Sequence, residues 1–274
     1  MHALPHVLWI GGPSGSGKTT VARRLARRHG LRWYNSDAHT WEHRDRALAA
    51  GHPAAARWEE WRAIPQSERP ELTHAEKVAM SLAAEREWMI VDDLRALPSA
   101  PLIVAEGGLL TPRSAGTGPR AVWLIPAADI RRSRLEQRPY SWEDVEFSLR
   151  NGQKIEKQVD EAGARKLVLD DRDIEEAVAE VEKVFADSLA EGPTATTVAE
   201  RRELLRYANR VIVDQHLTAF ARPWSSVDPR TAVRAFDCEC AHPECEAQVE
   251  LAIADFPAPP DATSPPVLAP GHSA

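Results

Sequence analysis

The sequence predicts an α/β protein in which helices cover both faces of a parallel sheet. Three observations support this fold class. A short apolar run, residues 7–10, leads directly into a glycine-rich loop and then a helix-like stretch. Later apolar runs of strand length are separated by longer helix-like segments, which is the pattern of parallel sheets. Hydrophobic residues make up 43% of the 274 residues, enough for a substantial core.

The glycine-rich loop, residues 12–19, is a complete G-x-x-x-x-G-K-[ST] phosphate-binding motif in its expected strand and helix context. Glycines let the backbone present successive N–H groups to phosphate oxygens, and the helix that begins near Lys18 points its positive dipole end at them. Lys18 is expected to reach the β- and γ-phosphates, and Thr19 to offer its hydroxyl to Mg²⁺. The alternative is an ordinary loop rich in Gly and Ser. The residues expected to bind ATP are Gly12, Pro13, Ser14, Gly15, Ser16, Gly17, Lys18, Thr19 and Thr20.

Turn residues divide the rest of the first 190 residues into further elements. Gly30 ends the first helix, and Pro101 and Pro126 bound later apolar runs. Residues 74–97 fit a helical stripe, although residues 88–92 could instead form a strand. The other strands are expected at residues 31–35, 102–106, 121–125 and 166–170, and the helices at 20–29, 129–138 and 174–189.

Carboxylates follow two of these strands. Ligands of open parallel sheets bind beyond the carboxyl ends of the strands, so Asp37 is a candidate to orient or deprotonate a substrate hydroxyl. Its alternative role is to cap the segment that follows. An acid after another apolar strand is the usual second Mg²⁺ contact in phosphate-loop folds. We favour Glu106 over Asp92 because Pro101 and Gly107 bound its strand more clearly.

Residues 39–73 are predicted to form a cap, because they are polar, rich in proline and tryptophan, and follow the second strand. Trp58 and Trp61 are three residues apart and share one helical face. Local packing of these rings is the simpler interpretation, and contact with a small-molecule ligand is the alternative.

Residues 129–155 are predicted to form a lid region that contains an arginine-rich helix. Arg131, Arg134 and Arg138 are spaced by three and four residues and therefore line one face. They form either a solvated stripe with ordinary ion pairs or a set of guanidinium groups that neutralise charge on a transferred phosphoryl group.

Residues 5–190, with these motifs in this order, resemble the small-molecule and nucleoside monophosphate kinases of the phosphate-loop class, which include shikimate, gluconate and adenylate kinases. The resemblance implies a P-loop NTPase three-layer sandwich with a five-stranded parallel sheet, an acceptor-binding cap and an arginine-bearing lid. It implies that Asp37 contacts the acceptor hydroxyl and that Arg134 and Arg138 belong to the lid. It also implies an ATP-dependent kinase. The expected substrate-binding residues are Asp37, His39, Glu106, Gly107 and Gly108, the expected catalytic residues Lys18, Asp37, Arg134 and Arg138, and the expected Mg²⁺ ligands Thr19 and Glu106.

The kinase-like domain is expected to span residues 1–191, and residues 192–274 are expected to form a small α+β module rich in cysteine. A helical stripe covers residues 199–217, and Cys238, Cys240 and Cys245 follow in a Cys-x-Cys-x₄-Cys pattern. Structural zinc usually takes four N or S ligands, so His272 or the nearer His242 could complete a site. The segment resembles a Cys-rich tail of small actinobacterial proteins in which Pro-Gly-His recurs, which favours His272. The alternative is three reduced thiols without metal.

Charge and composition limit the remaining classes. The net charge of −7 provides no overall basic field for nucleic acid, and a polynucleotide kinase would need a basic channel. No signal sequence or membrane-length apolar run is evident, and three clustered cysteines do not suit a disulfide framework, so a cytoplasmic protein is expected. The expected partners are ATP and a small-molecule acceptor. The alternative function is an ATP-dependent switch that acts on a protein partner through the C-terminal module.

Overall fold

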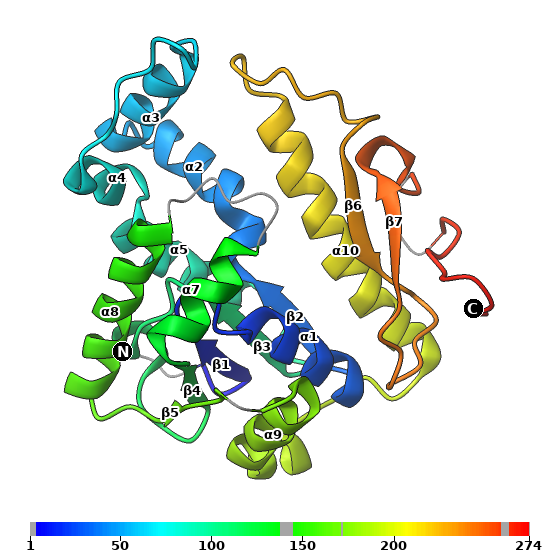
Figure 1. Ribbon diagram of the computed structural model, residues 1–274. Helices are drawn as coiled ribbons and strands as arrows, with labels where there is room; N and C mark the ends of the chain where they lie inside the picture. The colour runs from blue at the N-terminus through cyan, green and yellow to red at the C-terminus, as the bar shows by residue number, and fades with distance from the viewer. Residues whose placement is uncertain (1–3, 138–144, 171, 259–262, 274) are drawn as a thin grey trace. The chain divides into compact units, whose positions relative to one another are not determined.

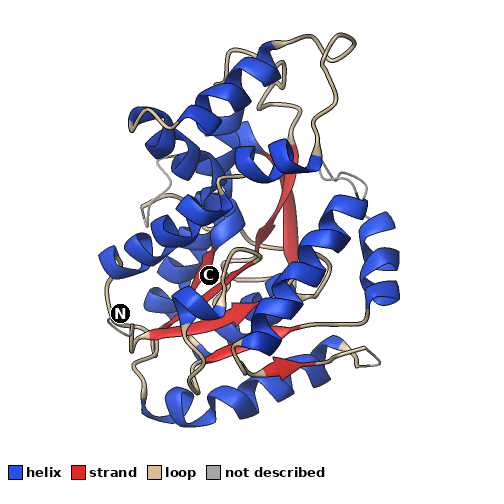
Figure 2. Cartoon of the chain, turned by 90° about the vertical axis from the view of Figure 1, so that its left-hand side faces the viewer, coloured by secondary structure: helices blue, strands red, loops and turns tan. Residues whose placement is uncertain are grey.

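The computed structural model describes residues 4–137, 145–170, 172–258 and 263–273. The chain divides into two compact units, and helices predominate over strands (Figure 2). Unit 1 comprises Met1–Asp37 and Ile90–Thr197, and unit 2 comprises Ala38–Met89 and Val198–Ala274. The predicted cap and nearly all of the predicted C-terminal module therefore belong to unit 2, although more than 100 residues separate them in the sequence.

Unit 1 contains a parallel sheet of five strands in the order β2-β3-β1-β4-β5. All five residues of β1 and of β3 are buried, as expected for strands covered on both faces. The register places Glu106 opposite both Ile10 of β1 and Asn35 of β2, so the carboxyl ends of these three strands meet at one edge. The predicted fold class is confirmed. The strands are β1 Val7–Gly11, β2 Arg32–Asn35, β3 Ile103–Gly107, β4 Ala121–Leu124 and β5 Lys166–Leu167.

Helices surround this sheet (Figure 1). The first helix, α1, packs against α9, and their polar faces are joined by ion pairs of Arg24 and Arg28 with Glu175. No helix in the described ranges has the length and hydrophobicity needed to cross a lipid bilayer. The helices are α1 Lys18–His29, α5 Ala83–Ala96 (which begins in unit 2), α6 Pro112–Ala115, α7 Ala128–Glu136, α8 Val145–Glu161 and α9 Ile174–Glu191.

The structure corrects the length of the predicted fifth strand and decides whether residues 88–92 form a helix or a strand. The fifth strand is shorter than the predicted 166–170, because Val168 is 55% exposed and Asp170 turns back to accept the backbone N–H of Ala127 at 2.7 Å. Residues 88–92 are helical rather than a strand, since Ile90 and Leu94 are fully buried one helical turn apart. The apolar run at 88–92 is therefore one face of α5.

Unit 2 consists of the cap helices, a long helix and a two-stranded antiparallel sheet. In this unit α10 contacts both α2 and β6, and Figure 1 shows α10 beside the β6–β7 hairpin. Thr73 and Glu76 form a reciprocal capping box that starts α4. The elements are η1 Ser36–His39, which begins in unit 1, α2 Thr40–Ala49, α3 Pro53–Ala63, α4 His74–Met80, α10 Val198–Phe220, β6 Val233–Asp237, β7 Gln248–Ala252 and η2 Ile253–Asp255.

Guanidinium groups of the cap stack on indole rings, one of them from the segment after α10. The Cζ atom of Arg44 lies 4.4 Å from the centroid of the Trp58 ring, and that of Arg62 lies 4.3 Å from the Trp224 ring. The Trp58 and Trp61 centroids are 5.4 Å apart. These contacts agree with local packing of the two rings, because arginine stacking on tryptophan is itself stabilising. Ligand contact by the same rings stays a prediction.

A buried ion pair joins α10 to the residue that links the first two cysteines. Arg206 Nη2 donates to Glu239 Oε2 at 2.6 Å, and the two side chains are only 7% and 0% exposed. Asn209 Nδ2 donates to Glu239 Oε1 at 2.9 Å, and the backbone N–H of Val267 donates to Oε2 at 3.0 Å. The carboxylate is therefore satisfied from three directions, as a buried charge must be.

We predict that Arg206→Leu lowers the free energy of unfolding of unit 2 by about 3–5 kcal/mol, because it leaves the Glu239 carboxylate buried and unpaired. Urea unfolding followed by tryptophan fluorescence measures this change. Arg210→Ala, one turn along the same helix, removes an exposed pair with Asp214 and should change the value by less than about 0.5 kcal/mol. Equal effects of the two substitutions would contradict the assigned role of the buried pair.

Candidate functional site

The phosphate-binding loop connects the central strand β1 to α1. Gly17 caps the helix with φ +85°, a left-handed conformation that a residue with a side chain rarely adopts. Lys18 and Ser16 are buried, with exposed fractions of 6% and 3%, and the Ser16 hydroxyl has no hydrogen-bond partner among the described residues. Thr19 is exposed in the first turn of the helix. The loop thus combines a helix N-terminus, an ammonium group and hydroxyls, which together form an anion site.

Glu106 is the most unusual acid of unit 1, because it is fully buried at the end of β3. Burial raises the pKa of its carboxyl to about 7, although the nearby Lys18 charge opposes the shift, the Asp37 charge adds to it, and the Thr19 hydroxyl weakly opposes it. No hydrogen bond of ordinary geometry reaches either carboxylate oxygen within the described part of the chain. Lys18, Thr19, Asp37 and Glu106 therefore lie close enough to influence one another electrostatically.

Gly107, the last residue of β3, and Gly108, which follows it, lie beside other parts of the site. A Cβ atom on Gly107 would collide with the hydroxyl of Ser36, the fully buried residue that precedes Asp37. A Cβ atom on Gly108 would lie 3.8 Å from the carbonyl oxygen of Gly12 in the phosphate-binding loop. Sequence reasoning did not single out Ser36, although its place directly after β2 was a usable signal. Gly107 thus allows Ser36, at the end of β2, to approach the end of β3, whereas a Cβ on Gly108 would make only an ordinary contact.

Asp37 is exposed, and its backbone N–H donates to the side-chain oxygen of Asn35 at 3.0 Å. It is the last residue of unit 1. His39 belongs to unit 2, where its Nδ1 lies 3.1 Å from Glu42 Oε2 and its ring stacks on His43 with centroids 6.1 Å apart. Of the predicted substrate-binding residues, the structure therefore groups Asp37, Glu106, Gly107 and Gly108 within one unit.

The arginines on one face of α7 have different surroundings. Arg134 Nη1 donates to the carbonyl oxygen of Gly15 in the phosphate-binding loop at 3.2 Å. Arg131 is 1% exposed and packs where Gly152 of α8 has no side chain. Burial lowers the pKa of Arg131, while the Glu156 charge opposes the shift. Arg138 lies outside the described residues. Arg134 is thus a predicted lid residue with a described contact to the loop.

The oxygen donors around the loop fit Mg²⁺. This ion prefers oxygen ligands and keeps several waters, so it needs only one or two protein groups. Glu106 supplies two buried oxygens without ordinary hydrogen bonds, and Thr19 supplies a hydroxyl close to them. Asp92, the alternative predicted ligand, is instead exposed on α5 and pairs with Arg95 at 2.9 Å. The donor set therefore supports the choice of Glu106 over Asp92.

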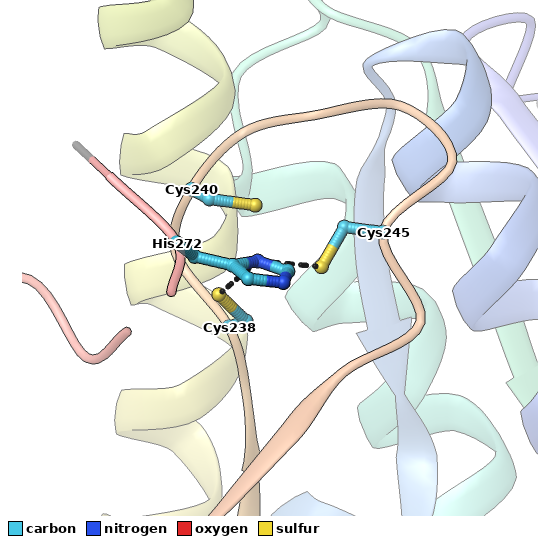
Figure 3. Close-up of side chains that lie close together, drawn as sticks. All are labelled: Cys238, Cys240, Cys245 and His272. Carbon is cyan, nitrogen blue, oxygen red and sulfur yellow. Dashed lines mark hydrogen bonds between the residues drawn. The ribbon is translucent and has the colours of Figure 1, made fainter. Parts of the chain in front are cut away.

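Unit 2 contains a second cluster, formed by Cys238, Cys240, Cys245 and His272 (Figure 3). One ligand atom from each residue lies within 4.8 Å of all the others. None of the three cysteines forms a disulfide. Burial raises the pKa of the Cys240 thiol, but hydrogen bonds from the His242 backbone, the His272 side chain and the other two cysteines outweigh burial and lower it to about 6. The sequence analysis named these four residues, and the structure brings them together.

A phosphate-binding loop between a central parallel strand and a helix, with a lysine and a buried acid at the same sheet edge, defines a nucleotide-binding α/β protein of the P-loop class. The chain belongs to the AAA domain family, which it matches over residues 8–159. The predicted P-loop class is confirmed by this match. The match includes the loop, Asp37 and Glu106, whereas α10 and the cysteine cluster lie outside it.

Solved structures with similar folds include three kinases. A sugar kinase from a Janibacter species, without ligand, is 21% identical, with 67% of this chain and 96% of that chain covered and a TM-score of 0.40. A gluconokinase from Sinorhizobium meliloti is 18% identical, with 69% and 96% covered and a TM-score of 0.43. A shikimate kinase from Acinetobacter baumannii, bound to shikimate, is 17% identical, with 66% and 93% covered and a TM-score of 0.40. No curated protein matches the sequence.

The raised pKa of Glu106 predicts a specific pH dependence of stability. The unfolded state releases this proton near pH 4.5 and the folded state near pH 7, so the folded protein loses stability as the pH rises between these values. At about 1.4 kcal/mol per pH unit, the loss approaches about 3 kcal/mol above pH 7 in the nucleotide-free protein. Glu106→Gln removes this component. Urea unfolding of both proteins from pH 4 to pH 8 measures it, and a difference between them that stays constant with pH would contradict the raised pKa.

Proposed function

We propose that this chain is an ATP-dependent phosphotransferase that transfers the γ-phosphoryl group of ATP to a hydroxyl group of a small molecule. The observation that carries the proposal is the grouping of Lys18, Thr19, Asp37 and Glu106 at the carboxyl edge of β1 and β3. A switch or a motor needs the loop and the metal ligands. An additional exposed carboxylate beside them is what a transferase needs to receive an acceptor hydroxyl.

On the donor side, the loop N–H groups and Lys18 bind the phosphates. Thr19 and Glu106 are the residues that would hold Mg²⁺, which neutralises phosphate charge when bound. Arg134 lies beside the loop through its bond to Gly15, so its planar cation is suited to stabilise charge on the transferred phosphoryl group. Phosphoryl transfer depends mainly on this kind of positioning and charge stabilisation.

On the acceptor side, two neighbouring carboxylates have different environments and therefore suit different roles. Glu106 is fully buried beside Lys18 and is suited to hold a metal ion. Asp37 is exposed and is suited to orient an incoming hydroxyl or take its proton. The acceptor contacts predicted for His39, Gly107 and Gly108 stay predictions.

The proposal is tested by ADP release from the purified full chain, with Mg-ATP and a library of hydroxylated metabolites. We expect one chemical class to raise ADP release and to gain a phosphate, detected by mass spectrometry. Lys18→Ala should abolish both signals, because the loop loses its phosphate-binding cation. A low basal rate that no small molecule raises, but that a protein partner changes, would contradict the kinase and support the ATP-dependent switch.

Asp37→Asn should lower turnover of the identified acceptor by about 10²–10⁴-fold, the usual contribution of a general base. The affinity for nucleotide should stay within about twofold, because Asp37 does not belong to the phosphate-binding loop. Titration with a fluorescent ATP analogue gives the affinity, and steady-state kinetics gives kcat and KM. If Asp37→Asn weakens nucleotide binding as much as turnover, Asp37 supports the loop rather than the acceptor.

A further inference from the structure

The cysteine cluster of unit 2 joins segments that are far apart in the sequence. Cys238 follows β6 directly, Cys245 lies shortly before β7, and His272 comes from the C-terminal segment. Figure 3 shows the three thiols and the imidazole converging on one point. None of these four residues has a role in the proposed phosphotransferase reaction.

Two distances within the cluster match the sulfur–nitrogen edge of a coordination tetrahedron. Zn–S bonds of about 2.3 Å and Zn–N bonds of about 2.05 Å, at tetrahedral angles, place sulfur and nitrogen ligands about 3.6 Å apart. The Nδ1 atom of His272 lies 3.4 Å from Cys238 Sγ and 3.6 Å from Cys245 Sγ. One nitrogen faces both sulfurs at nearly equal distance, as three ligand atoms around a shared ion would be arranged.

The structure also distinguishes between the two histidines that the sequence left open. His272 contributes a ring nitrogen to the cluster. Both histidines are exposed, but His242 Nδ1 accepts the backbone N–H of Glu244 at 3.2 Å, a local turn contact. His272 is therefore the histidine that is placed to act as a fourth ligand.

The surroundings suit thiolates that bind a metal with no open position. Cys238 is fully buried and Cys245 is 8% exposed. The backbone N–H of Ala269 donates to Cys238 Sγ at 3.3 Å, the kind of outer hydrogen bond that orients a metal ligand. Three sulfurs and one nitrogen occupy all four tetrahedral positions, as in structural rather than catalytic zinc sites.

We propose that Cys238, Cys240, Cys245 and His272 bind one structural Zn²⁺ ion. The residue between the first two ligands explains what the ion would hold in place. Glu239 is buried against Arg206 of α10 and accepts the N–H of Val267 from the C-terminal segment. The Cys-Glu-Cys segment thus anchors the hairpin to α10 through its middle residue and binds the ion through the residues on either side. The ion adds the cross-link that a small module with a limited core needs.

The test begins with the metal content of the full chain purified without chelator, measured by inductively coupled plasma mass spectrometry. We expect about one zinc per chain, and His272→Ala should reduce zinc affinity at least about tenfold in a competition titration with a chromogenic chelator. His242→Ala is the matched control and should bind zinc like the unchanged protein. Cys245→Ser should also lose metal.

If a cysteine variant fails to fold, the same site can be tested by binding Co²⁺ in place of Zn²⁺ to the protein without substitutions. Co²⁺ in a three-thiolate and one-imidazole site should give visible d–d bands typical of tetrahedral coordination and thiolate charge-transfer bands in the near ultraviolet, both abolished by added Zn²⁺. Zinc below about a tenth of an equivalent together with no cobalt spectrum would overturn the proposal. Stoichiometric iron in place of zinc, or equal loss of metal in His242→Ala and His272→Ala, would also overturn it.

Discussion

The burial of the Glu106 carboxylate where the carboxyl ends of β1, β2 and β3 meet is the constraint around which the candidate site of unit 1 is arranged. Burying a carboxylate is costly, and burial raises the pKa of Glu106 to about 7 although the Lys18 charge opposes the shift. The pairing of β3 with β1 places Glu106 opposite Ile10. The same register places Asn35 on the other side of Glu106, so Asp37 is brought to this edge. Gly107 is required there because a side chain would displace Ser36. The pairing of three strands thus brings the residues of the candidate site to one sheet edge.

The sheet could be predicted from the sequence because its central strands are buried on both faces and therefore are continuous apolar runs. This rule also explains the error at the fifth strand, where the run continues beyond Leu167 although Val168 is exposed. The cap helices α2 and α3 were not predicted, because their stability comes from contacts such as Arg44 on Trp58 and Arg62 on Trp224. Such stacking has no 3.6-residue apolar pattern that the sequence alone displays.

In the candidate site, too, some features could be predicted from the sequence and others could not. The loop was predictable because its motif is defined by local spacing, and the place of Glu106 at the end of β3 was predictable from the apolar run before it, whereas its metal-binding role stays a prediction. The burial of Arg131 was not predictable, since it depends on Gly152 of another helix. Glu239 pairs with Arg206, which lies 33 positions away in the sequence. The burial of Glu239 could therefore not be predicted from its place between two cysteines. Most of the features that could not be predicted from the sequence depend on contacts between residues that are far apart in it.

In unit 2 the cap is combined with residues from the C-terminal part of the chain. The backbone N–H of Trp41 in α2 donates to Gln215 Oε1 of α10 at 3.0 Å, and Arg222 pairs with Asp45. Farther along, Trp224 Nε1 donates to Glu59 Oε2 at 2.7 Å. The cap lies inside the family match, but α10 and the residues after it lie outside. The cap is therefore packed by a part of the chain that the family match does not include. Because the buried Arg206–Glu239 pair fixes that same helix to the hairpin, the stability of the cap and of the cysteine module is physically coupled through α10.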